Sequence, residues 1–326
     1  CIVAHEAVCR MIETIDAIVL AGDRSGSRNF AGGNKNFLEL AGKPLLLHVI
    51  GALNDVAEIA RIAIVGPATA ISELLQDRQA ELRDNLEIIV VEQKDTAYDN
   101  FWAAFLQLLG DTYSPGIEST NKRFEDKAVL LVPGDTPLMR ADEIREFLGR
   151  CAAQDLDYGV GMTEERFLRR FGPKDGTPGI EMNYLHLSSG SFRLNNLHFA
   201  RPFRVGKREY VERIYEYRYQ RQLMNMLRVV KDILLTPGLG LRPVAFYLYA
   251  QLATRCFARG YHRLLAMVRQ RLTPQKVTRI ASILLQANVR IIETSGGGCA
   301  IDVDNEKDYE TLRLRYDEFT MQSPGC

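Results

Sequence analysis

The segment Ile15-Asp-Ala-Ile-Val-Leu-Ala-Gly-Asp-Arg-Ser-Gly-Ser-Arg-Asn-Phe-Ala-Gly-Gly-Asn-Lys35 places a short apolar strand directly before a glycine-rich, basic loop. Apolar residues from Ile15 to Leu20 are typical of a buried strand. The glycines of the loop let backbone N–H groups point toward an anion without a Cβ atom in the way. The positive charges that match an anion are Arg24, Arg28 and Lys35. The segment therefore predicts a phosphate-binding loop, in preference to an ordinary glycine-rich connection.

Two common phosphate motifs do not fit this loop. A P-loop requires Gly-x-x-x-x-Gly-Lys-Ser/Thr, and a dinucleotide fingerprint requires Gly-x-Gly-x-x-Gly at the start of a helix. The loop instead resembles the nucleotide-binding signature of the nucleotidyltransferases typified by molybdenum-cofactor guanylyltransferase. In that family Leu-Ala-Gly, a basic glycine loop and a lysine follow the first strand. The matching residues here are Leu20-Ala21-Gly22 and Lys35, and the resemblance continues through Gly42-Lys43-Pro44-Leu45.

The resemblance implies which loop residues contact a nucleoside triphosphate (NTP). These residues are Leu20, Ala21, Gly22, Arg24 and Lys35, with Lys35 also catalytic. Arg28 is favoured over Arg24 as the catalytic loop arginine. The chain departs from the family pattern at Asp23, where a glycine is common, and its loop is a few residues longer.

A second motif, Ala128-Val-Leu-Leu-Val-Pro-Gly134-Asp135-Thr136-Pro137-Leu138, is again a buried strand that ends in a turn. In open α/β sheets ligands bind at the carboxyl ends of the strands. The motif resembles the family's Gly-Asp-x-Pro-Leu turn, which implies that Asp135 is catalytic and binds Mg²⁺, or Mn²⁺ in its place. Without its position on a fourth strand, Gly-Asp-x-Pro would read as a simple turn with a helix cap.

The third motif, Asp302-Val-Asp304-Asn-Glu-Lys-Asp308-Tyr309, resembles the segment that closes the family's domain. The resemblance implies that Asp302 is the second metal ligand and that Asp304 caps the last helix. Two carboxylates together with substrate phosphates and water suit Mg²⁺. Asp302 and Asp304 fall on the same face of an alternating strand pattern, so the two roles are interchangeable on this evidence.

Strand and helix patterns alternate through the first half of the chain. Strands are predicted at residues 15–20, 61–65, 86–91, 128–132 and 158–162, and helices at 44–56, 69–82, 100–109 and 141–153. Such alternation indicates an α/β fold, a Rossmann-like three-layer α/β/α arrangement with a mostly parallel sheet. We expect a nucleotidyltransferase domain at residues 11–200 and 289–319, and a basic all-helical insertion at 201–288.

Further contacts to the substrates are expected from two segments of the domain. Thr96 and Asn100 follow the third strand, where the family contacts the nucleotide, although capping of the next helix by Asp95, Thr96 or Asp99 is favoured. Asn196 matches an asparagine that lies beside the family's acceptor pocket. Arg193 and Lys174 are candidate ligands of an acceptor phosphate, and no catalytic role is assigned to His186 or His198.

The insertion concentrates positive charge in a chain whose formal net charge is zero. Residues 201–290 contain 18 Lys or Arg and four acidic residues, and no acidic residue occurs from Ile233 through Ile292. Leucine and aromatic residues recur there at helical spacings, but no apolar run reaches the ~18 residues that span a bilayer. Three interpretations compete: a helical lid or homodimer module, a helical surface that binds an anionic membrane, and a nucleic-acid site, which has no motif and is disfavoured.

Composition agrees with an intracellular enzyme. The chain has 326 residues, 46% of them hydrophobic, which is enough for a large core. Six cysteines lack Cys-x-x-Cys spacing, and the N-terminus has no secretory pattern. We therefore expect a cytoplasmic protein, with peripheral binding at the inner face of the membrane if the basic helices contact lipid.

Together the motifs predict a Mg²⁺-dependent transfer of a nucleoside monophosphate from NTP to a phosphorylated or phosphonate acceptor, a small molecule or a lipid precursor, with release of pyrophosphate. The alternatives are a nucleotide-sugar glycosyltransferase, which would place Asp-x-Asp where Gly-Asp-Thr-Pro stands, and a non-catalytic nucleotide-binding or membrane-associated protein. The sequence leaves the base and the acceptor open.

Overall fold

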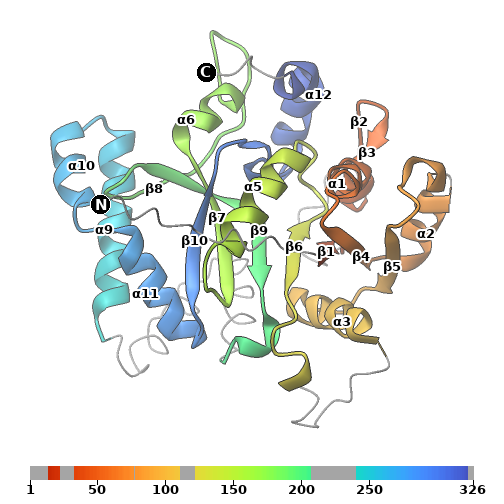
Figure 1. Ribbon diagram of the computed structural model, residues 1–326. Helices are drawn as coiled ribbons and strands as arrows, with labels where there is room; N and C mark the ends of the chain where they lie inside the picture. Colours follow the sequence, from red (N-terminus) through yellow and green to blue (C-terminus); the bar gives the residue numbers. More distant parts are fainter. Residues whose placement is uncertain (1–13, 23–32, 77, 111–121, 207–239, 322–326) are drawn as a thin grey trace, which may run out of the picture.

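A mixed sheet of eight strands forms the centre of the protein (Figure 1). The computed structural model describes residues 14–22, 33–76, 78–110, 122–206 and 240–321. Seven strands run side by side in the order β10-β7-β9-β6-β1-β4-β5, and β8 pairs with β9. Their bounds are β1 Ile15–Leu20, β4 Ile59–Gly66, β5 Glu87–Glu92, β6 Val129–Pro133, β7 Tyr158–Glu164, β8 Leu185–His186, β9 Ser191–Ala200 and β10 Val289–Thr294. The strands β2 Glu39–Leu40 and β3 Lys43–Pro44 form a separate hairpin.

The strands β5, β4, β1 and β6 are parallel, as the alternation of elements predicts. Ile18 of β1 lies beside Ala63 of β4 and Leu131 of β6. Strand β9 is antiparallel to both of its neighbours, β6 and β7, and β10 runs parallel to β7 at the edge. The sequence patterns missed β9 and β10 as strands of this sheet. A short alternating run carries little information about which strand will pair with it.

Helices cover both faces of the sheet and make the expected three layers. Alternate residues of β1 point to opposite faces: Ala17 and Val19 pack with α1, α2 and α5, whereas Ile18 packs with α3. Bounds of these helices are α1 Leu45–Asn54, α2 Ala68–Gln76, α3 Ala97–Leu109 and α5 Ala141–Ala152. The predicted helix at 69–82 is too long, because α2 ends at Gln76 and only a 3-10 turn, η2 Gln79–Glu81, follows.

Short elements and one long helix complete the domain. They are η1 Lys35–Phe37, α6 Glu165–Leu168, η4 Arg169–Phe171, η5 Pro202–Arg204, η6 Gly298–Ala300 and α12 Glu306–Thr320. Asp302 and Asp304 follow η6 in extended but unpaired backbone, so the predicted strand there is wrong. The prediction that Asp304 caps the last helix is also wrong: the Asn305 side chain is the cap and accepts a hydrogen bond from the backbone N–H of Asp308.

Three described helices lie between β9 and β10 in the sequence: α9 Arg242–Ala258, α10 His262–Arg269 and α11 Pro274–Leu285. They lie beyond the β10 edge of the sheet, on the left of Figure 1. Ala253 and Cys256 of α9 pack with Met162 of β7 and Phe192 of β9, so these helices share a core with the sheet. No helix in the described ranges is long and apolar enough to cross a membrane.

Candidate active site

The carboxyl ends of β1 and β6 meet at the site that the sequence motifs predict. The backbone N–H of Gly134 donates to the carbonyl of Leu20 at 2.9 Å, and the N–H of Ala21 donates to the carbonyl of Val65 at 2.7 Å. A Cβ atom on Gly134 would lie 2.6 Å from the side-chain oxygen of Asn36. Glycine is therefore required for the turn before Asp135 to approach the loop that carries Lys35.

Two asparagines that the sequence analysis did not single out fix the backbone around Lys35. The side-chain oxygen of Asn34 accepts hydrogen bonds from the Asn36 backbone N–H at 3.0 Å and from the Asn36 side-chain amide at 2.8 Å. The Asn34 amide donates to the carbonyl of Ala21 at 3.0 Å. The only sequence signal for this arrangement is the Asn-Lys-Asn pattern itself. These hydrogen bonds hold the backbone on both sides of Lys35 next to the end of β1.

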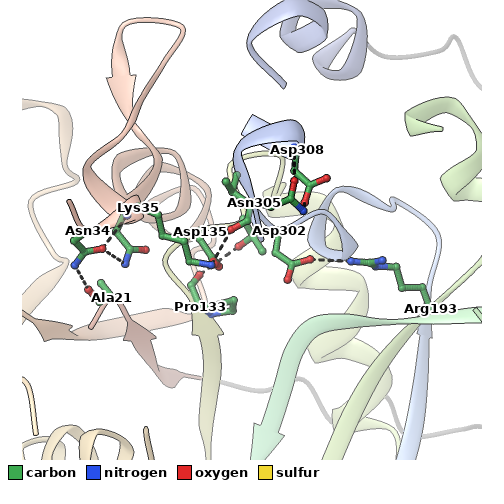
Figure 2. Close-up of polar contacts among 12 residues, drawn as sticks. Ala21, Asn34, Lys35, Pro133, Asp135, Arg193, Asp302, Asn305 and Asp308 are labelled. Carbon is green, nitrogen blue, oxygen red and sulfur yellow. Dashed lines mark hydrogen bonds and ion pairs between the residues drawn. The ribbon is translucent and has the colours of Figure 1, made fainter. Parts of the chain in front are cut away.

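Lys35 and Asp135 form an ion pair in the centre of the site (Figure 2). The Lys35 ammonium also donates to the carbonyl of Val303 at 2.7 Å, and the Val303 backbone N–H donates to the carbonyl of Asp135 at 3.0 Å. Asp135 is only 7% exposed. Its Oδ1 atom is buried and has no hydrogen-bond partner among the described residues. A buried carboxylate oxygen with a free coordination position suits a divalent cation.

Burial and charge act in opposite directions on this pair. Burial raises the pKa of Asp135, and the nearby Asp302 adds to that rise, whereas Lys35 opposes it. Burial works to lower the pKa of Lys35, but the carboxylates of Asp135, Asp304 and Asp302 hold it above its usual value. Lys35 therefore stays protonated and neutralises part of a cluster of negative charge.

Asp302 lies beside this pair and is held by an arginine from β9 (Figure 2). The Arg193 guanidinium donates from Nη2 to Asp302 Oδ1 at 2.9 Å and from Nε to the carbonyl of Ala300 at 2.9 Å. From the sequence, Arg193 is a candidate for binding an acceptor phosphate. In the structure its Nε and Nη2 donors are instead used by Ala300 and Asp302. The neighbouring Asn196 donates its amide to the carbonyl of Cys299 at 3.0 Å, so it also contacts the backbone before Asp302.

A buried carboxylate from α5 supports the same segment from the other side. Glu143 is 1% exposed, and its Oε1 accepts from the Thr294 hydroxyl at 2.8 Å and from the Gly297 N–H at 3.0 Å. Its Oε2 accepts from the Cys299 N–H at 3.1 Å. The Thr294 hydroxyl also accepts from the Asn195 amide at 3.0 Å. No sequence pattern marks Glu143, because its partners lie on β10 and in the turn that follows.

Thr96 and Asn100 lie at the start of α3, beside the end of β1. The Thr96 side chain caps α3 by accepting from the Asp99 N–H at 3.0 Å, which confirms the favoured capping interpretation. Asn100 is buried, and its side-chain oxygen accepts from the Lys94 N–H. A Cβ atom on Gly22 would lie 3.3 Å from the Asn100 amide and 3.1 Å from Gln93 Oε1. The Asn100 and Gln93 side chains therefore lie directly beside Gly22, the first residue of the glycine-rich loop.

Several predicted features lie outside the described residues: Arg24 and Arg28, Gly26 and Gly32, and the first ten residues. Asp304 is exposed, whereas Asp302 is half-buried. Within the described ranges no three His, Cys, Asp or Glu side chains are clustered as a metal site. His186 contacts the Ser191 hydroxyl and His198 contacts the Tyr158 hydroxyl, both away from the Asp135 turn.

Comparison with known proteins identifies the family of the chain. The MobA-like NTP transferase domain matches residues 17–233, more than half of the chain. The chain belongs to this family. The matched range includes Lys35 and Asp135, and it ends before Asp302. The family predicted from the Leu20-Ala21-Gly22 loop is therefore confirmed.

Relatives of the family differ widely in sequence from this chain. A molybdenum cofactor guanylyltransferase of Shewanella sediminis (strain HAW-EB3) is 26% identical over 152 residues, which cover 47% of this chain and 64% of that protein. A hypothetical transferase from Thermus thermophilus has the same fold: its TM-score is 0.52 at 20% identity, over 90% of this chain and 99% of that one. A 4-diphosphocytidyl-2C-methyl-D-erythritol synthase from Anaerococcus prevotii DSM 20548 has a TM-score of 0.44 at 13% identity, over 94% and 97% of the two chains.

Proposed function

We propose that this protein is a nucleotidyltransferase that moves a nucleoside monophosphate from an NTP to a phosphorylated or phosphonate acceptor, a small molecule or a lipid precursor. An acceptor oxygen forms a bond to the α-phosphorus, the bond from that phosphorus to the bridging oxygen breaks, and pyrophosphate leaves with the electron pair. The observation that carries the proposal is the contact of Lys35 with Asp135, at the carboxyl ends of β1 and β6, in a member of this family.

The residues divide the work by charge. The Gly22 backbone, Lys35 and the loop arginine Arg28 bind the triphosphate, because each supplies hydrogen-bond donors or positive charge. Asn100 and Gln93 stand beside Gly22, where a nucleoside attached to that triphosphate would extend. Asn196 borders the acceptor side. A phosphate acceptor is ionised at neutral pH, so the chain does not need a general base.

Asp135 and Asp302 are the residues that would hold Mg²⁺ or Mn²⁺. The buried, unpartnered Oδ1 atom of Asp135 supports this assignment, and Arg193 orients the Asp302 carboxylate toward the same region. When bound, the cation would neutralise charge on the phosphates during transfer. Asp302 is favoured over Asp304, because Asp304 is exposed and Asp302 is held in place.

The test is release of pyrophosphate from CTP, GTP, ATP and UTP with a panel of phosphorylated acceptors. Lys35→Ala and Asp135→Asn should each lower turnover by roughly 100-fold or more, as expected for groups that stabilise transition-state charge. The exposed Lys276 and Asp142 provide matched controls as Lys276→Ala and Asp142→Asn. Near-normal turnover in either site variant would exclude this site, and transfer of sugar from a nucleotide sugar would favour the glycosyltransferase alternative.

A further inference from the structure

The outer surface of α9 and α10 combines exposed apolar side chains with positive charge. Twelve large apolar side chains are exposed in the described part of the chain, and nine of them lie between Leu241 and Met267. Most monomeric proteins avoid so dense an apolar surface unless it binds something. The nine are Leu241, Tyr247, Leu248, Tyr249, Leu252, Phe257, Tyr261, Leu264 and Met267.

Helix α9 contacts the rest of the protein through a narrow strip and is otherwise largely exposed. Phe246, Ala250, Ala253 and Cys256 face the core formed with β7 and β9. Leu241, Leu248, Leu252, Arg255 and Arg259 share the opposite arc, because they follow one another at helical spacings of three, four or seven residues. On α10, Leu265 and Val268 are buried, while Tyr261, Leu264 and Met267 are exposed. We call the exposed side chains of residues 241–267 the α9–α10 surface.

Charge on this surface has one sign. Arg242, Arg255, Arg259 and Arg263 are exposed, and no acidic residue occurs between Ile233 and Ile292. Among the described residues, Arg255, Arg259 and Arg263 form no ion pair. Exposed arginines beside exposed leucine, methionine and tyrosine match the two layers of a lipid interface, where phosphate head groups lie above acyl chains.

We propose that the α9–α10 surface binds the surface of an anionic phospholipid bilayer. The arginines contact lipid phosphates, and Leu248, Leu252, Leu264 and Met267 enter the boundary of the acyl chains. Self-association through this surface is disfavoured, because a two-fold dimer would place the same positive surface against itself. Nucleic acid would match the charge but not the exposed leucine and methionine side chains. The proposal is independent of the catalytic one.

The experiment is co-sedimentation of the full chain with vesicles of phosphatidylcholine alone or mixed with phosphatidylglycerol. We expect binding only to the mixed vesicles, weakening as salt is raised. Arg255→Glu/Arg259→Glu should lower the bound fraction roughly tenfold or more, and Leu248→Ser/Leu252→Ser should lower it while leaving the charge unchanged. A matched control is Arg313→Glu/Leu314→Ser on α12, where Leu314 is 72% exposed.

Three results would overturn the proposal. One is a wild-type chain that does not sediment with phosphatidylglycerol vesicles. Another is equal binding to the two kinds of vesicle, or equal binding of both surface variants and the wild type. The third combines two measurements: analytical ultracentrifugation shows that the wild type is a dimer and that Leu248→Ser/Leu252→Ser is a monomer, while this variant still binds lipid. That result would assign the surface to a second copy of the chain.

Discussion

At the residue scale, the site depends on a few side chains held by neighbours that are distant in the sequence. Lys35 contacts Asp135 and the carbonyl of Val303, and Arg193 holds Asp302. The two neighbouring carboxylates each have a charged partner, Lys35 for Asp135 and Arg193 for Asp302. When a nucleotide and its cation bind, Lys35 would contact the phosphates, and Asp135 and Asp302 would contact the cation. These contacts would replace the ion pairs described above.

Binding of Mg²⁺ with NTP should therefore stabilise the wild-type chain more than Asp135→Asn. A ligand that binds only the folded state raises the melting temperature by mass action. The expected result is a rise for the wild type when NTP and Mg²⁺ are both present, with little rise after chelation of the metal. An equal rise in Asp135→Asn would contradict the assignment of Asp135, whatever the acceptor proves to be.

Arg193 should act as a positioning residue for Asp302. Lysine has a single side-chain nitrogen, so it cannot reproduce the fixed fork with which the guanidinium donates from Nη2 to the Asp302 carboxylate and from Nε to the Ala300 carbonyl. We expect Arg193→Lys to raise the Mg²⁺ concentration needed for half-maximal pyrophosphate release by about 10- to 100-fold, the usual range for residues that orient a metal ligand. Arg290→Lys, an exposed substitution on β10, is the control, and the same metal requirement in both variants would contradict this role.

At the scale of elements, buried and half-buried polar groups join helices to the loops around the site. Glu143 of α5 binds the turn after β10, and His48 of α1 contacts both the Leu40 carbonyl at 2.8 Å and the Tyr316 hydroxyl of α12 at 3.0 Å. These contacts determine where the backbone of Asp302 and the end of α12 lie. They connect elements that the chain reaches only after long separations.

Glu143→Gln should destabilise the protein. The amide group of glutamine would place a donor against the backbone N–H groups of Gly297 or Cys299, which would leave buried groups unpaired at a cost of about 1–3 kcal/mol. Urea unfolding of the variant measures this cost. Glu146→Gln is the matched control. Glu146 lies on the same helix as Glu143 and accepts a hydrogen bond from the Ser295 N–H, but its side chain is more exposed. A larger loss of unfolding free energy in the control would contradict the argument.

His48 should make stability depend on pH. Burial lowers the pKa of His48 from its usual 6.5, so the unfolded chain binds a proton at a higher pH than the folded one. The stabilisation is present above about pH 6.5 and is lost as the pH falls through the lowered value. In His48→Gln the loss of unfolding free energy on acidification should be smaller than in the wild type, whereas His262→Gln, at an exposed position, should keep the wild-type dependence.

At the scale of the whole molecule, the sheet separates the candidate active site from the α9–α10 surface. Strands β6 and β1 carry the site, three and four strands away from β10, and α9 and α10 lie beyond that edge (Figure 1). This separation leaves the two surfaces without shared residues. The interpretation of residues 201–288 as an inserted module stays a prediction, although α9 packs into the same core as β7 and β9.

Substitutions on the α9–α10 surface should leave catalysis in solution unchanged. We expect Leu248→Ser/Leu252→Ser and Arg255→Glu/Arg259→Glu to release pyrophosphate from a water-soluble acceptor within about twofold of the wild type, because exposed changes far from a site have small effects. Assays without lipid measure this. A large loss in both variants, with unchanged melting temperature, would show that the surface takes part in the site.

The sequence alone determined strand β1 with Gly22 and Lys35 at its carboxyl end, the Asp135 turn and the parallel arrangement of β1, β4, β5 and β6. Each of these depends on neighbouring residues: an apolar run, then glycine and charge within a few positions. Even there Arg24 and Arg28 lie outside the described residues, and their roles stay predictions.

Only the tertiary structure decided the rest. It placed β9 antiparallel between β6 and β7, and it paired Arg193 with Asp302. It also showed that Asn305, and not the predicted Asp304, caps α12. It also revealed Glu143, whose hydrogen-bond donors on residues 294–299 lie about 150 residues further along the chain. Contacts of this range have no local pattern, because their energy comes from burial that exists only after the sheet and its helices have packed.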